Sequence, residues 1–231
     1  MSVAKLENAV SSPHRSDGQQ LLTSTLGPLR RGDATALLDR LERDWPVERL
    51  VGLLNSDDDD VVKVAATCLG LVGSASECAH LARLLHHDDS VVVSMAEHAL
   101  WRIWFRQAPA KACQAMYRAI ELIEQGRCES ALTLLNTVIR RCPTFAEAYN
   151  QRAIALQLLE RYNQAVADCR RAVELNPTHF AALANMGHAL SQAGRYLEAL
   201  QTYRAVLQIH PRMEGVRQSI RRIRACCPQR A

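Results

Sequence analysis

The residues best suited to chemistry lie in the first half of the chain, where histidines and aspartates gather. Residues 86–89 read His-His-Asp-Asp, and His80 and His98 lie within reach of them in sequence. Imidazole and carboxylate groups in such clusters can bind zinc or iron. The acidic run at residues 57–60 offers the carboxylate oxygens that calcium prefers. Both segments are therefore candidates for a metal site.

The pattern around these residues favours a structural role instead. The 57–60 run lacks the alternating ligands, central glycine and terminal glutamate of a calcium-binding EF-hand loop. Some di-iron proteins bind their metal with repeated His-Glu pairs, and the only comparable dipeptide here, Glu97-His98, is reversed and not repeated. Acidic residues just before a helix stabilise its N-terminus through capping and the helix dipole. We expect capping at 57–60 and 88–89, no metal or cofactor, and no catalysis, because no catalytic constellation stands out elsewhere.

The cysteines and the hydropathy indicate a cellular location. The eight cysteines are scattered, and Cys68, Cys128 and Cys169 occupy helical positions that favour a small apolar side chain. Cys226 and Cys227 are adjacent, which is poor geometry for a bond between them. No apolar run reaches the roughly 20 residues needed to span a bilayer, and the N-terminus has no hydrophobic signal core. We predict a protein of the reducing cytoplasm with no membrane attachment.

Charge is distributed unevenly along the chain. Residues 1–108 carry 11 Lys/Arg and 15 Asp/Glu, whereas residues 109–231 carry 17 and 9. A basic half could serve nucleic acid or an acidic partner. However, Arg140 and Arg141 lie toward a helix end, where cations complement the dipole, and no aromatic stacking platform accompanies the arginines. We therefore predict a protein or peptide partner, with an acidic one as a candidate, rather than nucleic acid.

A 34-residue period organises the second half of the chain. The residues that recur at this spacing are Pro143, Pro177 and Pro211; Ala131, Ala165 and Ala199; Ala119, Ala153 and Gly187; and, at a turn, Gly126, Glu160 and Gly194. Proline cannot continue a helix, and small residues let two helices approach closely. Each period therefore predicts one pair of antiparallel helices.

This register resembles the tetratricopeptide repeat (TPR), with three repeats over about 112–211. The resemblance implies helix pairs stacked into a solenoid. Thr144 and Glu147 have the spacing of a capping box at the start of a helix.

Residues 212–231 follow the last repeat and contain an amphipathic segment. Its apolar residues recur at helical spacing: Met213, Val216, Ile220 and Ile223. We expect this helix to cap the open apolar face of the last repeat, and a separate binding helix is the alternative.

The first half follows a different period, of 31 residues. Segments 50–71 and 81–102 superpose at this offset as helix, acidic turn and helix. They resemble HEAT-like repeats of the short kind found in phycobilin lyases. Residues 34–44 supply an incomplete leading helix, and residues 1–30 are expected to be loosely ordered.

Together these patterns predict an all-α fold, an α-solenoid of helical hairpins. Its expected parts are a loosely ordered segment (1–30), HEAT-like repeats (31–108), three TPRs (109–211) and a cap helix with a tail (212–231).

The TPR resemblance implies a concave groove lined by the first helix of each pair. The residues it places there as partner contacts are Asn150, Gln151, Ile154, Gln157, Asn185, His188 and Gln192. Amide side chains both donate and accept hydrogen bonds, which suits a bound peptide. In the first repeat, Met116, Tyr117 and Ile120 either line the groove or pack against the preceding HEAT-like helices.

Chaperone-binding members of the family hold a terminal carboxylate with basic residues and asparagines at five groove positions. The residues at those positions here are Met116, Ile120, Gln151, Ala181 and Asn185. The basic residues are absent, and only the two amides could bond a carboxylate. The resemblance therefore argues against a chaperone C-terminal carboxylate as the ligand.

We predict a non-catalytic interaction scaffold, or adaptor, that binds a peptide or partner segment in the TPR groove. The alternative is an accessory subunit of an enzyme or modification system, with the lyase-like segment in its first half. Repeat folds host many functions, so the architecture alone does not name the partner.

Overall fold

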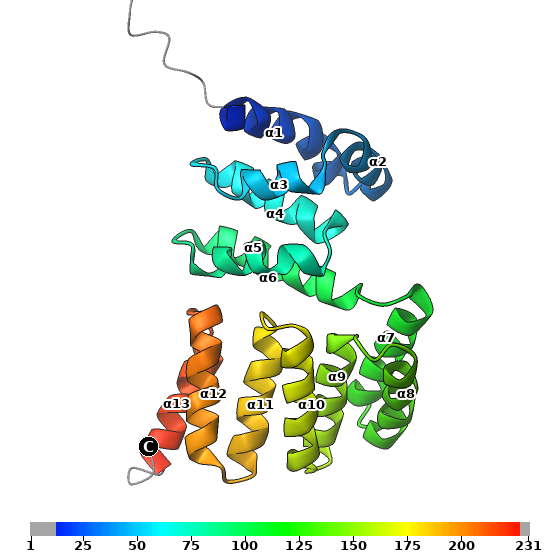
Figure 1. Ribbon diagram of the computed structural model, residues 1–231, viewed down its shortest axis with the longest axis vertical. Coiled ribbons are helices and arrows are strands. Elements are labelled where there is room, and N and C mark those ends of the chain that lie inside the picture. Colours follow the sequence, from blue (N-terminus) through cyan, green and yellow to red (C-terminus); the bar gives the residue numbers. More distant parts are fainter. Residues whose placement is uncertain (1–12, 227–231) are drawn as a thin grey trace, which may run out of the picture. The chain divides into compact units, whose positions relative to one another are not determined.

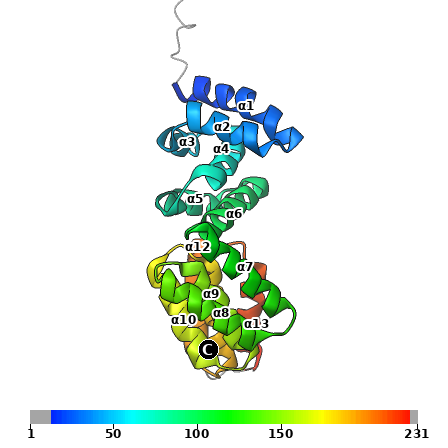
Figure 2. The same ribbon diagram turned by 90° about the vertical axis from the view of Figure 1, so that its right-hand side faces the viewer.

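The computed structural model describes residues 13–226, and residues 1–12 and 227–231 lie outside the described part. All the secondary-structure elements assigned to residues 13–226 are helices (Figures 1 and 2). This confirms the predicted all-α solenoid of hairpins. The chain divides into two compact units, Met1–Leu100 and Trp101–Ala231. The boundary between them falls inside helix α6, and each unit is described by itself.

Three helical hairpins make up the described part of the first unit. They are α1 (Pro13–Arg31) with α2 (Ala34–Asp44), α3 (Val47–Leu53) with α4 (Asp59–Val72), and α5 (Cys78–Arg83) with α6 (Ser90–Phe105). Short 3-10 turns at Ala75–Glu77 and Leu84–His86 flank α5. Helix α2 has the bounds expected for the leading helix, but it is paired with α1 instead of standing alone.

Helix α1 forms within the segment 1–30 that we expected to be loosely ordered. It contains Gly18 and Pro28, which disfavour a helix. Leu21 is fully buried, and a Cβ atom added to Gly18 would lie 2.9 Å from the Val61 side chain on α4. Close packing on α4 therefore orders α1, although its sequence favours a loop.

The two acidic runs cap helices, as expected. Asp58 accepts a hydrogen bond from the Asp60 backbone amide (3.0 Å) at the start of α4. Asp89 accepts one from the Val91 amide (2.7 Å) at the start of α6. The Lys63 ammonium group lies 3.2 Å from Asp60 and 2.8 Å from Asp89, so it joins neighbouring hairpins and lowers the pKa of the Asp89 carboxyl. These side chains stabilise helix starts and the contact between repeats.

The second unit contains three further hairpins and a final helix. They are α7 (Ala110–Glu124) with α8 (Cys128–Arg141), α9 (Ala146–Leu158) with α10 (Tyr162–Leu175), α11 (Phe180–Gln192) with α12 (Tyr196–Ile209), and then α13 (Glu214–Cys226). Consecutive helices pack against each other in chain order (Figure 1). The turn inside each hairpin has one residue with a left-handed backbone: Gly126 (φ 74°), Glu160 (φ 58°) and Gly194 (φ 75°). These are the turn positions that the 34-residue register predicts.

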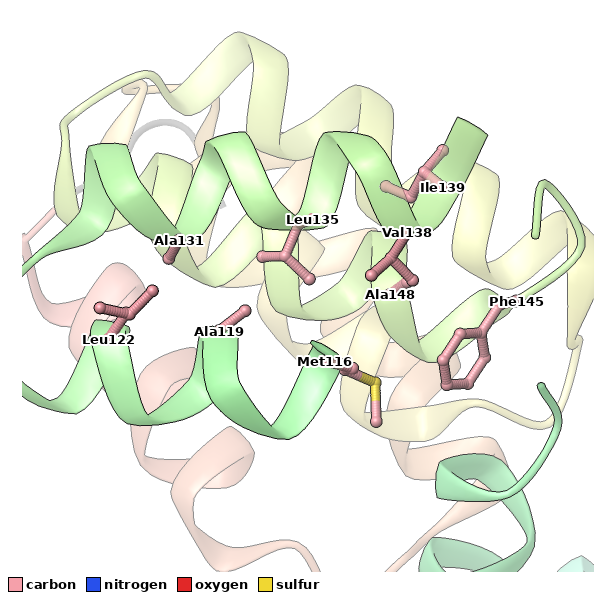
Figure 3. Close-up of a cluster of buried hydrophobic side chains, with 9 residues drawn as sticks. All are labelled: Met116, Ala119, Leu122, Ala131, Leu135, Val138, Ile139, Phe145 and Ala148. Atoms are coloured by element: carbon pink, nitrogen blue, oxygen red, sulfur yellow. The ribbon is translucent and has the colours of Figure 1, made fainter. Parts of the chain in front are cut away.

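A small residue on the first helix of a pair lies against a larger residue on the second. In the first pair, Ala119 and Leu135 share a buried apolar cluster (Figure 3). In the third pair, a Cβ atom added to Gly187 would lie 2.5 Å from the ring of Tyr203. The small positions of the repeat therefore set how closely the paired helices approach.

Helix α13 packs on α12 at the end of the solenoid. It buries Val216, Ser219 and Ile223 and keeps its arginines on exposed positions. The predicted domain boundaries after residues 30, 108 and 211 remain a prediction. The boundary between the two compact units falls after Leu100.

Candidate functional site

The groove residues predicted from the sequence lie on α9 and α11, and hydrogen bonding divides them into two groups, of which the first is linked to a buried network. Asn150 and Gln151 are 1% and 8% exposed, and Asn185 beside them is half-buried. In the other group Gln192 is exposed, and Ile154, Gln157 and His188 are half-buried and reach solvent in part. We call this second group the accessible groove surface.

The buried group belongs to a polar network around Glu147. Glu147 Oε2 lies 2.8 Å from His179 Nε2, and both side chains are fully buried. Glu147 Oε1 accepts hydrogen bonds from Asn150 (3.2 Å) and Gln151 (2.6 Å). Asn185 Nδ2 donates to Asn150 Oδ1 (2.8 Å), which joins α11 to α9. These amides therefore satisfy the buried carboxyl group of Glu147 inside the fold, because buried polar atoms need hydrogen bonds to replace those of water.

The prediction of a capping box formed by Thr144 and Glu147 is wrong. Helix α9 begins at Ala146 with Phe145 at its N-cap, and no side chain makes the capping hydrogen bond. Glu147 instead bonds to His179, which follows Phe145 by one 34-residue period. A histidine at a repeat position that is apolar in the preceding repeat is the sequence signal that could have revealed this pair.

Aromatic residues at the end of α6, within the second unit, lie against the network. The Trp104 ring is fully buried and stacks on the His179 imidazole at 4.1 Å between centroids, with 20° between the planes. Trp104 also meets Phe180 edge-on at 5.1 Å, and Trp101 meets His179 edge-on at 6.3 Å. Trp104 Nε1 has no hydrogen-bond partner among residues 13–226. The chain's own tryptophans therefore cover this part of the α9–α11 surface.

The candidate residues of the first repeat are also engaged in packing. Met116 is fully buried in the apolar cluster of α7, α8 and α9 (Figure 3). Phe105 and Ile120 pack against that cluster. Tyr117 is 49% exposed, and its ring lies 5.5 Å from the ring of Phe105. The structure thus favours packing against the end of α6 over an open groove in this repeat.

The accessible groove surface leads into a pocket of about 200 Å³ between α11, α12 and α13. The residues that line it are His188, Ser191, Gln192, Tyr203, Ser219, Arg222 and Ile223. Tyr203 Oη lies 2.8 Å from His188 Nδ1. Burial lowers the pKa of His188, and the Arg222 guanidinium lowers it further. The imidazole is therefore neutral at neutral pH. Sequence reasoning missed Tyr203, Ser219 and Arg222, because they lie outside the first helices of the three repeats.

No helix between residues 13 and 226 is both long and apolar enough to cross a bilayer. Within those residues, no three His, Cys, Asp or Glu side chains are grouped so that they could hold a metal ion. His87 lies 3.6 Å from Asp59, at the two acidic turns.

The consecutive stacked hairpins define an α-solenoid of repeats. Family models identify both kinds of repeat: HEAT repeats match residues 18–101, and tetratricopeptide repeats match residues 146–179 and 169–201. The chain is a tetratricopeptide repeat protein with HEAT-like repeats in its first half. The HEAT match begins within α1, in agreement with the three hairpins observed there. Kinship with the phycobilin-lyase kind of HEAT repeat remains a prediction.

Known proteins support this assignment. A TPR repeat-containing protein of Rhizobium etli is 30% identical over 108 residues, which are 47% of this chain and 53% of the relative. Small glutamine-rich tetratricopeptide repeat-containing protein 2 of Saccharomyces cerevisiae is 27% identical over 176 residues, covering 68% of this chain and 51% of the relative. The chain thus spans about half the length of these curated relatives.

A solved structure shares the fold of the second half. The first TPR of Spaghetti (RPAP3), bound to the HSP90 peptide SRMEEVD, is 24% identical, with 52% of this chain and 94% of that chain covered and a TM-score of 0.50. This likeness supports the TPR fold that the 34-residue register predicts for the second half.

The expectation that argued against a chaperone C-terminal carboxylate is wrong. A TPR domain with this fold is bound to an HSP90 peptide. The expectation depended on five positions, and two of them, Met116 and Gln151, are buried here. A ligand cannot reach those two side chains, so the five positions do not describe this groove completely, and their lack of basic residues does not exclude this class of ligand.

Proposed function

We propose that this protein is an interaction scaffold: a non-catalytic cytoplasmic adaptor whose TPR unit binds an acidic peptide segment of a partner protein. The observation that carries the proposal is the accessible groove surface, where Gln157, His188 and Gln192 reach solvent on the first helices of two neighbouring repeats. Amide and imidazole groups can donate hydrogen bonds to the carbonyl and carboxylate oxygens of an extended peptide.

The charge of the second half supports an acidic ligand. Residues 109–231 carry 17 Lys/Arg and 9 Asp/Glu. Several of the acids are already engaged with arginines, as in the bidentate pair of Arg152 with Asp168, at 2.7 Å for both bonds. The surplus cations attract acidic segments and speed their association.

Carboxyl, imidazole and thiol groups that could react are buried in the packing of the protein, which supports a non-catalytic, intracellular role. Glu147 and His179 form a buried pair that stabilises the contact between two repeats. Burial raises the pKa of the Cys68 thiol to about 12, so this cysteine acts as a small apolar side chain. Buried thiols of this kind suit a reducing compartment.

The test uses the fluorescein-labelled peptide SRMEEVD and fluorescence anisotropy on the full chain. We expect saturable binding to the wild type and several-fold weaker binding to Gln192→Glu, because the new carboxylate repels an acidic ligand on the accessible groove surface. Gln201→Glu is the matched control, since Gln201 is exposed on α12 and the change in net charge is the same. It should bind like the wild type.

Two results would contradict the proposal. One is a folded wild-type protein that binds neither SRMEEVD nor other acidic peptides. The other is equal weakening by Gln192→Glu and Gln201→Glu, which would indicate long-range charge rather than contact at the groove.

A further inference from the structure

We propose that the pocket between α11, α12 and α13, here called the Arg222 pocket, is a binding site for the C-terminal carboxylate of an acidic peptide. The inference rests on the proposed function and adds to it the group that is recognised and the residues that recognise it. The pocket lies at the α13 end of the accessible groove surface and shares His188 and Gln192 with it. The lining of the Arg222 pocket includes none of the five positions at which chaperone-binding TPRs hold a terminal carboxylate, which are Met116, Ile120, Gln151, Ala181 and Asn185 in this chain.

Arg222 supplies the positive charge of the pocket. On the same helix, Arg221 pairs with Glu214, and Arg217 donates two hydrogen bonds to the Pro211 carbonyl oxygen (3.1 and 2.7 Å). Among residues 13–226, Arg222 forms no ion pair, and no Asp or Glu lines the pocket. A guanidinium group binds a carboxylate through two parallel hydrogen bonds, which is the arrangement that an unpaired arginine can offer.

His188 supplies a neutral hydrogen-bond donor beside the charge. When Tyr203 donates to Nδ1 across their 2.8 Å contact, the neutral imidazole carries its proton on Nε2. Nε2 has no other hydrogen bond among the described residues. Ser219 is already committed, since its hydroxyl donates to the Gly215 carbonyl oxygen (3.0 Å). Arg222, His188, Gln192 and the Ser191 hydroxyl are therefore the donors left to meet an anion in this pocket.

The dimensions of the pocket favour a chain terminus. Its volume of about 200 Å³ admits a group the size of one residue rather than a folded surface. Ile223 adds an apolar wall beside the donors, and Tyr203 closes the base at 1% exposure. A C-terminal residue offers a carboxylate for the donors and an apolar side chain for this wall.

The first experiment compares SRMEEVD with the same peptide ending in a carboxamide. We expect Arg222→Gln to weaken binding of the free acid by about tenfold, in line with the loss of a charged hydrogen bond. Arg224→Gln is the matched control, because Arg224 is exposed on α13 and does not line the pocket. The carboxamide peptide should bind the wild type about as weakly as the free acid binds Arg222→Gln. Equal binding of both peptides to the wild type would overturn the terminal carboxylate as the group recognised.

The second experiment separates the pocket from the proposed function. Sodium acetate is titrated against sodium chloride at equal ionic strength, and the NMR resonances of the His188 ring are followed in the wild type and Arg222→Gln. The pocket predicts an acetate-specific shift that disappears in Arg222→Gln. Such a shift without any peptide binding would support the pocket while the proposed function fails. Peptide binding that is equal in wild type and Arg222→Gln, with no acetate shift, would overturn the pocket and leave the proposed function standing.

Discussion

At the scale of single residues, Glu160 holds a backbone conformation that favours glycine. Its φ is 58°, and the equivalent turn positions of the other two hairpins are Gly126 and Gly194. A left-handed conformation costs a residue with a Cβ atom roughly 1–2 kcal/mol, and glycine returns about 0.5–1 kcal/mol of that through its freedom in the unfolded chain. We expect Glu160→Gly to stabilise the protein by up to about 1 kcal/mol in denaturant unfolding.

The control for this change is Gln201→Gly, at an exposed position inside α12 where φ is helical. It should destabilise the protein by about 1 kcal/mol, because glycine is a poor helix former. If Glu160→Gly lowered stability as much as Gln201→Gly, the turn of the second hairpin would not depend on a left-handed residue.

The same scale shows how far the site could be predicted from the sequence. Repeat spacing correctly places residues on α9 and α11, but it does not show what covers them. Asn150 and Gln151 are bound by Glu147, and Trp104, from outside the TPRs, covers the adjoining His179. Burial by a segment distant in sequence has no local signal.

At the scale of elements, the contact between α11 and α12 depends on Gly187. A Cβ atom there would lie 2.5 Å from the Tyr203 ring, so the two helices would have to move apart or the ring would have to turn. We expect Gly187→Ala to destabilise the protein by about 1–3 kcal/mol, although alanine is the better helix former. It should also weaken SRMEEVD binding, because Tyr203 forms the base of the Arg222 pocket.

Gly215→Ala on α13 is the matched substitution. A Cβ atom at Gly215 has nothing within 4 Å, so this change should leave stability unchanged or raise it by up to about 1 kcal/mol. Unfolding curves of both variants distinguish packing from helix propensity. A Gly187→Ala variant as stable as Gly215→Ala would show that the Tyr203 ring moves aside without cost.

The bounds of helices were predicted well wherever turn residues interrupt a periodic sequence pattern. Prolines and glycines at 34-residue spacing mark the ends of the TPR helices, and α2 has the predicted bounds, Ala34–Asp44. Helix α1 was missed because Gly18 and Pro28 resemble loop residues, while the contact of Gly18 with Val61 that orders it is tertiary. Local propensity yields to packing in such a segment.

At the scale of the whole molecule, the second unit is a stack in which each helix is held mainly by its neighbours. Such a stack ends in an apolar face unless a final element covers it. Helix α13 covers α12 here and buries Val216 and Ile223. Helix α13 therefore contributes both to the buried contact with α12 and to the lining of the Arg222 pocket, so we expect binding at that pocket to depend on an intact α13.

Truncation after Pro211 tests the role of α13 as a cap. We expect a lower thermal midpoint and self-association in light scattering, because the truncated chain exposes the side of α12 that α13 covers. Val216→Asp in the full-length chain should reproduce both effects, since it places a charge in the buried contact, whereas Arg224→Asp on the exposed side should not. A truncated chain that kept the wild-type midpoint and remained monodisperse would contradict the cap role and favour the alternative, a separate binding helix, because a true cap cannot be removed without exposing the apolar end of the stack.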